Sequence, residues 1–312
     1  MLRNEPSPGP PALVIRGSMS ILDNPIPDRG GLDAPRSGIG LPRMDIDPRI
    51  TRAGGPGLGS FLSMAVSSWR SALGRNLAGV YVHGSVSTGA FNMRTSDIDV
   101  LVTTRVLTDA PANERLHEVH RAMHGWGGDR WADRLEAMFI PAKALAMPGI
   151  PRIAVLELHQ DDGFKVQALG PDLLIQRWVL RRHGITLFGP KISKIVAPVT
   201  GGELRDAIIG TLRTWWLPQL EYPGQFLKRG YQAYAVITMC RALGLLATGE
   251  LMTKPEAASW ALRGPYLEVW HPLIESAGAY PGGRQLDQRL ATLDFIRFAL
   301  EEAGISHSAP SS

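Results

Sequence analysis

Apolar residues in the first part of the chain recur in two spacings that predict different elements. Between residues 58 and 76 they lie three and four positions apart, which is the period of a helix, and a second helical pattern covers residues 111–126. Short apolar runs rich in β-branched and aromatic residues predict buried strands instead. Four such runs occur, at 78–83, at 100–102 as the continuation of Asp97-Ile98-Asp99, at 134–140 and at 154–159.

Beyond residue 170 the pattern turns helical and stays helical. Asp172 is placed to cap a helix that ends before Gly184. Helices joined by loops of ordinary length pack as a bundle, so we expect a helical C-terminal unit. Its five further helical stretches lie at 203–216, 226–248, 254–262, 267–279 and 285–303.

Composition narrows the class of protein. The chain has 312 residues, enough for two domains, and its 44% hydrophobic and 20% charged residues are ordinary for a globular protein. Cys240 is the one cysteine, which fits a reducing cytoplasm, and no apolar run is long enough to span a membrane. The net charge of +4 is spread without a Lys/Arg block, so we expect neither a nucleic-acid nor a membrane surface.

The two ends of the chain differ from its middle. Residues 1–57 contain 10 of the 24 prolines and show no sustained apolar period. Such a segment buries too little apolar surface to offset the entropy lost on ordering. We therefore expect a disordered extension over residues 1–57 and a flexible tail over residues 306–312.

Candidate chemistry concentrates between residues 84 and 99. Gly84 and Ser85 follow the first predicted strand, where glycine lets the backbone approach a ligand and a helix start directs free N–H groups at an anion. Asp97 and Asp99 begin the next strand, whose two-residue period puts both carboxylates on one face. A lone Gly-Ser is usually a turn and a lone Asp-x-Asp a solvated pair or a cap. Their order between two strands instead favours a site for Mg²⁺ and phosphate.

Two further side chains conflict with their local surroundings. Glu136 lies within the apolar run 134–140, so it either faces solvent at a strand edge or lies beside the aspartate pair. Thr253 and Glu256 have capping-box spacing, which places Lys254 in the first turn of a helix. The helix dipole disfavours a cation there, so Lys254 is either solvated or paired with an anion.

The order of these motifs resembles the signature of the polymerase-β-like nucleotidyltransferases, and most of all the streptomycin/spectinomycin (aminoglycoside) adenylyltransferase-like family. The resemblance covers about residues 60–303 and is strong at 83–102, 172–190 and 236–262. It implies an α/β plus all-α fold, with a mixed β-sheet of four or five strands in the N-terminal domain and a helical bundle after it. We expect the domains at 58–165 and 166–305.

The resemblance also implies roles for single residues. Gly84, Ser85 and Ser96 would contact the triphosphate of ATP, and Asp97 and Asp99 would bind Mg²⁺.

Four other residues acquire roles from the same resemblance. Glu136 would be the general base that takes a proton from the acceptor hydroxyl. Lys254 would contact the ATP phosphates from the C-terminal domain. Asp172 and Tyr280 would lie near the nucleotide, although Asp172 can serve as a helix cap and Tyr280 as a packing residue.

We therefore expect a monomeric, cytoplasmic enzyme that transfers AMP from ATP to a hydroxyl of an aminoglycoside-like small molecule and releases pyrophosphate, an antibiotic-resistance activity. Lys228 and Arg229 stand where the family binds a polycationic drug, and positive charge opposes such binding. Two alternatives stay open: a nucleotidyltransferase with a protein or tRNA acceptor, of the toxin-neutralising type, and a nucleotide-binding regulator without turnover. The intact carboxylates argue against the regulator.

Overall fold

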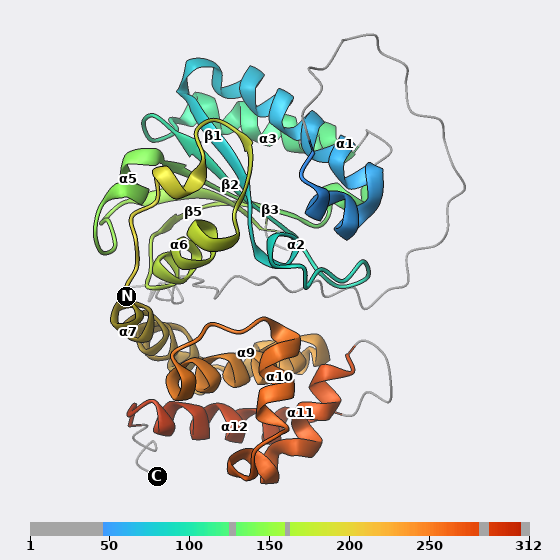
Figure 1. Cartoon of the computed structure of the whole chain (residues 1–312), viewed down its shortest axis with the longest axis vertical. Coiled ribbons are helices and arrows are strands. Elements are labelled where there is room, and N and C mark those ends of the chain that lie inside the picture. The colour runs from blue at the N-terminus through green and yellow to red at the C-terminus, as the bar shows by residue number, and fades with distance from the viewer. Residues whose placement is uncertain (1–45, 125–128, 160–162, 281–286, 307–312) are drawn as a thin grey trace, which may run out of the picture.

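The computed structural model of the protein describes residues 46–124, 129–159, 163–280 and 287–306. Its upper half in Figure 1 is a β-sheet with helices on both faces, and its lower half consists of helices. The helices of the upper half are α1 (Pro48–Leu73), α2 (Gly84–Thr88), α3 (Ala110–His124), α4 (Asp129–Ala132), α5 (Ala142–Ala146) and α6 (Asp172–His183).

The sheet is mixed and has six strands in the order β5-β4-β3-β2-β1-β6. Strands β2 and β3 are parallel, and the other neighbouring pairs are antiparallel. The strands are β1 (Leu77–Val82), β2 (Ile98–Thr104), β3 (Leu135–Pro141), β4 (Ala154–His159), β5 (Gly163–Ala168) and β6 (Ile185–Phe188). The first four confirm the strands predicted from the apolar runs.

Alternation along the central strands divides their side chains between two cores. In β2, Val100 and Val102 pack under α1 and α3, whereas Leu101 packs with α5 and α6 on the opposite face. Both faces are thus covered, which explains why the strands read as nearly continuous apolar runs.

The first helix starts ten residues earlier than the apolar pattern predicted, so the expected disorder of residues 48–57 is wrong. Asp47 caps it by accepting from the Arg49 amide at 2.9 Å, and the Ile50 side chain is fully buried. Gly55 has a φ of 65° and interrupts the helical geometry inside α1. The apolar residues before and after it therefore do not follow one continuous helical period, and the sequence reasoning missed the first part of the helix. Residues 1–45 of the predicted extension and residues 307–312 of the predicted tail lie outside the described residues.

The two outermost strands were missed by the sequence reasoning, which expected four or five strands. β5 lies at one edge and exposes much of its surface, so it lacks an apolar run. β6 has four residues and pairs antiparallel with β1, with Ile185 opposite Val82. The sheet therefore takes a strand from residues that we had expected in the C-terminal domain.

The lower half confirms the predicted helical bundle. Helix α9 runs through its centre and packs against its neighbours on several sides, which is why 14 of its 20 residues are buried. The helices are α7 (Gly201–Thr211), α8 (Leu217–Gln219), α9 (Arg229–Thr248), α10 (Lys254–Ala261), α11 (His271–Gly278) and α12 (Arg289–Glu302). Among the described helices, none is both long and apolar enough to cross a bilayer.

The predicted helix 203–216 is not one regular helix. A π-helical turn at Leu212–Trp216 separates α7 from α8. Pro218 lies two residues after this turn, and its ring lacks an N–H and crowds the carbonyl one turn back. A wider turn at this point avoids that clash.

Candidate active site

The turn between β1 and α2 brings the backbone against a carboxylate. Gly84 has a φ of 59°, and a Cβ at this position would overlap the Asp99 side chain. The His83 amide donates to the Asp99 carbonyl at 3.0 Å, which ties the turn to β2. Any residue other than glycine would therefore be strained and would displace Asp99. The sequence reasoning expected the glycine to admit a ligand close to the backbone, which stays a prediction; the approach to Asp99 was not foreseen.

Three carboxylates meet where two parallel strands begin. Asp97 immediately precedes β2, and Asp99 stands opposite Glu136 in the pairing of β2 with β3. Asp97 and Asp99 are 2% and 4% exposed. Since alternate residues share a face, Asp97, Asp99 and Glu136 lie on the side of the sheet that faces α6. This agrees with the second reading of Glu136, as a carboxylate beside the aspartate pair.

The Asp97 carboxylate fits a cation. Neither of its buried oxygens has a hydrogen-bond partner within the described part of the chain. Burial raises the pKa of Asp97 well above its ordinary value, and the charges of Glu136 and Asp99 raise it further, while Lys254 and Arg134 act in the opposite direction. A divalent cation would neutralise this repulsion, and buried carboxylate oxygens are the ligands that Mg²⁺ prefers.

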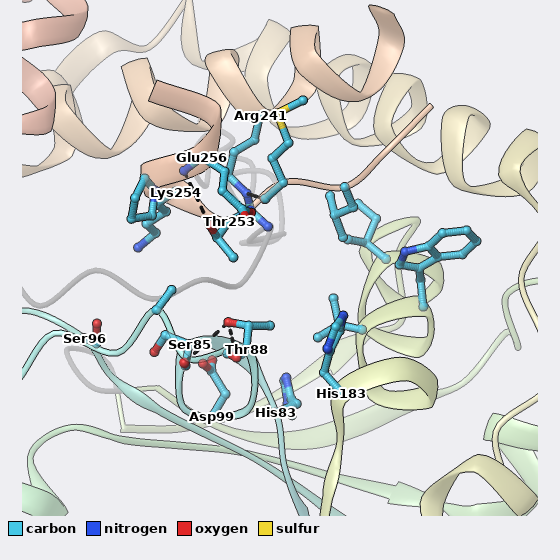
Figure 2. A pocket seen from close by; sticks show the side chains of 18 of the residues that line it. His83, Ser85, Thr88, Ser96, Asp99, His183, Arg241, Thr253, Lys254 and Glu256 are labelled. Carbon is cyan, nitrogen blue, oxygen red and sulfur yellow. Dashed lines mark hydrogen bonds between the residues drawn. The ribbon is translucent and has the colours of Figure 1, made fainter. Parts of the chain in front are cut away.

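The opposite wall carries two partly buried cations from the helical half (Figure 2). Lys254 is the first residue of α10, where the predicted capping box of Thr253 and Glu256 is confirmed. Arg241 comes from α9, and its Nε donates to the Met252 carbonyl at 3.0 Å. Burial lowers the pKa values of both Lys254 and Arg241. Two desolvated cations facing the aspartates form a setting in which a polyphosphate is stabilised.

Between the two walls lies a cavity of about 720 Å³. Figure 2 shows Ser85, Thr88 and Asp99 on its lower side, opposite Lys254 and Arg241. Of the residues that the sequence singled out, this cavity brings together Gly84, Ser85, Ser96, Asp97, Asp99, Asp172 and Lys254. Glu136 lies beside Asp99 without lining the cavity.

Two predicted site residues need separate comment. Tyr280 follows α11 and is not among the residues that line the cavity, so its role at the nucleotide stays a prediction. The expected capping role of Asp172 is wrong, because Pro171 occupies the N-cap and Asp172 is the first helical residue. Its carboxylate accepts from Gln176 Nε2 at 3.0 Å and lies in the first turn, where the dipole favours an anion.

Several lining residues were missed by sequence reasoning. Arg241 is one of them: it comes from the otherwise apolar helix α9 and lines the cavity. A charged residue in an otherwise apolar helix was the available signal. Trp178, His183 and Arg263 also line the cavity, and no local pattern distinguishes them from ordinary surface or packing residues.

Comparison with known proteins agrees with this division into two halves. A family model described as nucleotidyltransferase domain matches residues 65–152, and a model described as aminoglycoside adenylyltransferase, C-terminal domain, matches residues 194–297. The chain belongs to the aminoglycoside adenylyltransferase-like family of nucleotidyltransferases. It is accordingly an enzyme of the nucleotidyltransferase class.

The relatives of this adenylyltransferase-like chain are low in sequence identity but match it over most of their own length. An aminoglycoside (3'')(9) adenylyltransferase of Escherichia coli is 25% identical over 239 residues, which are 74% of this chain and 87% of the relative. A spectinomycin 9-adenylyltransferase of Staphylococcus aureus is 28% identical over 204 residues, 62% of this chain and 74% of the relative.

A solved structure agrees with the fold. The crystal structure of spectinomycin adenyltransferase AAD(9) from Enterococcus faecialis with ATP and spectinomycin matches with a TM-score of 0.61. It is 18% identical in sequence, and the match covers 78% of this chain and 99% of that chain. The adenylyltransferase-like chain therefore shares its two-part architecture, as the motif order predicted.

Proposed function

We propose that this protein transfers AMP from ATP to a hydroxyl of an aminoglycoside-like small molecule and releases pyrophosphate. One observation carries the proposal: Asp97 and Asp99 face Lys254 across a cavity that is also lined by the turn at Gly84. Glu136 lies beside Asp99 on the neighbouring strand. The relatives named as aminoglycoside or spectinomycin adenylyltransferases support the same activity.

The nucleotide half of the reaction uses both walls. In our proposal the turn at Gly84 and Ser85, with Ser96 and Lys254, binds the triphosphate, while Asp97 and Asp99 hold Mg²⁺. The metal ion would supply charge neutralisation at the phosphates. Lys254 and Arg241 add positive charge where negative charge accumulates on the leaving pyrophosphate.

The acceptor half uses Glu136. Its carboxylate takes the proton from the acceptor hydroxyl, whose oxygen forms a bond to the α-phosphorus of ATP. The bond from the α-phosphorus to the bridging oxygen breaks, and pyrophosphate leaves with that electron pair. The strand pairing supports this role, since it places Glu136 beside the proposed metal ligand Asp99.

The test combines α-labelled ATP and Mg²⁺ with separate acceptors: spectinomycin, streptomycin, other aminoglycosides, tRNA and a cell lysate. We expect labelled AMP on an aminoglycoside and free pyrophosphate. Asp97→Asn serves as the negative control and should lower transfer roughly a thousandfold while the circular dichroism spectrum is unchanged.

Other outcomes decide between the alternatives. Label on a protein or on tRNA alone would replace the small-molecule acceptor with a macromolecular one, for which the exposed Lys228 and Arg229 give a charge-based reason. No labelled product from any acceptor, with ATP still bound, would refute the transfer reaction. Normal turnover by Asp97→Asn would refute the metal assignment.

A further inference from the structure

The loop between α2 and β2 carries the residues that lead into the aspartate pair. It is partly exposed, yet three of its carbonyl groups converge on one side chain, Arg134. Arg134 Nη1 donates to the Met93 carbonyl at 2.9 Å, and Nη2 donates to the Asn92 carbonyl at 3.2 Å and to the Ser96 carbonyl. A planar guanidinium suits such a set, because its donors point in fixed directions.

Arg134 is itself firmly placed. It is 5% exposed, and its guanidinium lies 5.3 Å from the ring centre of Phe91 and 5.7 Å from that of Trp131. Its backbone carbonyl accepts from the Ile98 amide at 2.8 Å, which joins the start of β3 to the start of β2. The Arg134 side chain therefore binds the loop before β2, and the Arg134 backbone binds Ile98, the first residue of β2.

Asp97 lies between those two points. Its preceding carbonyl, that of Ser96, accepts from the Arg134 side chain, and its following amide, that of Ile98, donates to the Arg134 backbone. The Asp97 carboxylate has no hydrogen bond of its own among the described residues. The direction of this carboxylate is thus set by the backbone on either side of it, and Arg134 holds both sides.

The loop is also organised around the same carbonyls. The Ser96 and Thr95 amides donate to the Asn92 carbonyl, at 2.9 and 3.3 Å, and the Asn92 amide donates to Ser96 Oγ at 2.8 Å. This compact turn fixes Ser96, which lines the cavity next to Asp97. Loss of the guanidinium would leave these carbonyls facing a shorter side chain.

We propose that Arg134 is a positioning residue that orients Asp97 for Mg²⁺·ATP by donating hydrogen bonds to the carbonyls of the loop before β2. This inference rests on the proposed function in so far as Asp97 binds the metal. Partners behind a metal ligand commonly change metal affinity ten- to a hundredfold when they are removed.

The test compares Arg134→Lys with Arg181→Lys. Arg181 serves as the control because its Nη1 also donates to two backbone carbonyls, those of Ser193 and Val196, both at 2.7 Å, and it does not line the cavity. Amide hydrogen exchange of the peptide 91–97 is measured first in metal-free protein. The Mg²⁺ concentration giving half-maximal AMP transfer at saturating ATP is measured second.

For Arg134→Lys we expect at least tenfold faster exchange in peptide 91–97 and a tenfold or larger rise in the half-saturating Mg²⁺ concentration, with excess Mg²⁺ restoring most of the rate. Arg181→Lys should change neither value. Unchanged exchange or an unchanged Mg²⁺ requirement in Arg134→Lys would overturn the inference.

A second variant covers the case in which Arg134→Lys fails to fold. Phe91→Leu removes one ring beside the guanidinium and leaves its hydrogen bonds in place, so we expect smaller shifts in the same two directions. Absence of both shifts would overturn the proposal. If wild-type transfer does not need Mg²⁺, the metal assignment falls, while the exchange measurement still decides whether Arg134 holds the loop.

Discussion

At the scale of single residues, the site depends on positions where the residue type itself is decisive. Gly84 combines a positive φ with a Cβ position already filled by the Asp99 carboxylate. Asp97 is buried without a hydrogen-bond partner among the described residues, which costs free energy in the unliganded protein. The burial of Asp97 is unfavourable for stability alone and becomes favourable once a cation occupies the cavity, whereas glycine adopts the positive φ of residue 84 without steric strain.

A comparison of Gly84→Ala with Gly89→Ala separates the strain of a positive φ from the overlap of a Cβ with Asp99. Gly89 has a φ of 80°, and a Cβ there would meet no atom within 4 Å. Both variants should lose about 1–2 kcal/mol of unfolding free energy to backbone strain. Only Gly84→Ala should also lose AMP transfer, because it displaces Asp99. Urea denaturation and steady-state kinetics measure the two quantities, and equal activity in both variants would contradict the role given to Gly84.

Glu136→Gln tests the general base. The substitution keeps the shape of the side chain but cannot accept the acceptor proton as a carboxylate does. We expect the turnover number to fall roughly a hundred- to ten-thousandfold while the dissociation constant for ATP changes little. Calorimetric titration with a non-hydrolysable ATP analogue, alongside single-turnover transfer, separates binding from chemistry. Lost nucleotide binding would instead make Glu136 part of the metal site.

At the scale of elements, the first turn of α10 carries a phosphate-binding candidate into the cavity. Its capping box fixes the direction of that turn, and an identical box of Thr200 and Glu203 begins α7. The α7 box does not line the cavity. Two copies of one motif, one at the site and one away from it, allow the structural and functional contributions to be distinguished.

Thr253→Ala and Thr200→Ala form that comparison. Each removes a side chain that accepts from the third residue of its helix, so each should cost about 1 kcal/mol of unfolding free energy. Only Thr253→Ala loosens the turn that holds Lys254, and only this variant should raise the Michaelis constant for ATP several-fold. Equal Michaelis constants in the two variants would show that the cap does not position Lys254.

At the scale of the whole molecule, the cavity exists because two halves of different architecture face each other (Figure 1). The sheet half contributes the aspartates and the glycine turn, and the helical half contributes Lys254 and Arg241. Neither half contains the complete set. A nucleotide bound between them would therefore stabilise the protein by joining both walls.

Lys254→Met should weaken that joining because it removes a cation from the helical wall. Lys254 also offsets the charge of Asp97, so the gain on binding is measured against each variant's own unfolding free energy without ligand. Wild-type protein should gain about 2.7 kcal/mol when a Mg²⁺-bound ATP analogue is present at a hundred times its dissociation constant. The variant should gain less than about 1 kcal/mol at the same concentration, as measured by thermal or urea unfolding. Lys191→Met, at an exposed lysine outside the cavity, should respond like the wild type, and a full gain in Lys254→Met would contradict the assignment.

What the sequence by itself determined was local. Three motifs were predictable: glycine followed by serine, aspartates two positions apart, and the Thr253–Glu256 spacing. Each reflects a conformational preference that depends on only a few neighbouring residues. The apolar runs likewise marked the four inner strands, since burial on both faces leaves a continuous signal.

Tertiary structure alone decided which of these pieces meet. The parallel pairing of β2 with β3 places Glu136 beside Asp99, and the packing of α9 and α10 brings Arg241 and Lys254 to the opposite wall. The edge strands β5 and β6 and the grip of Arg134 on residues 92–96 likewise depend on partners far along the chain. Such contacts leave no period in the sequence, because their energy comes from distant groups that only folding brings together.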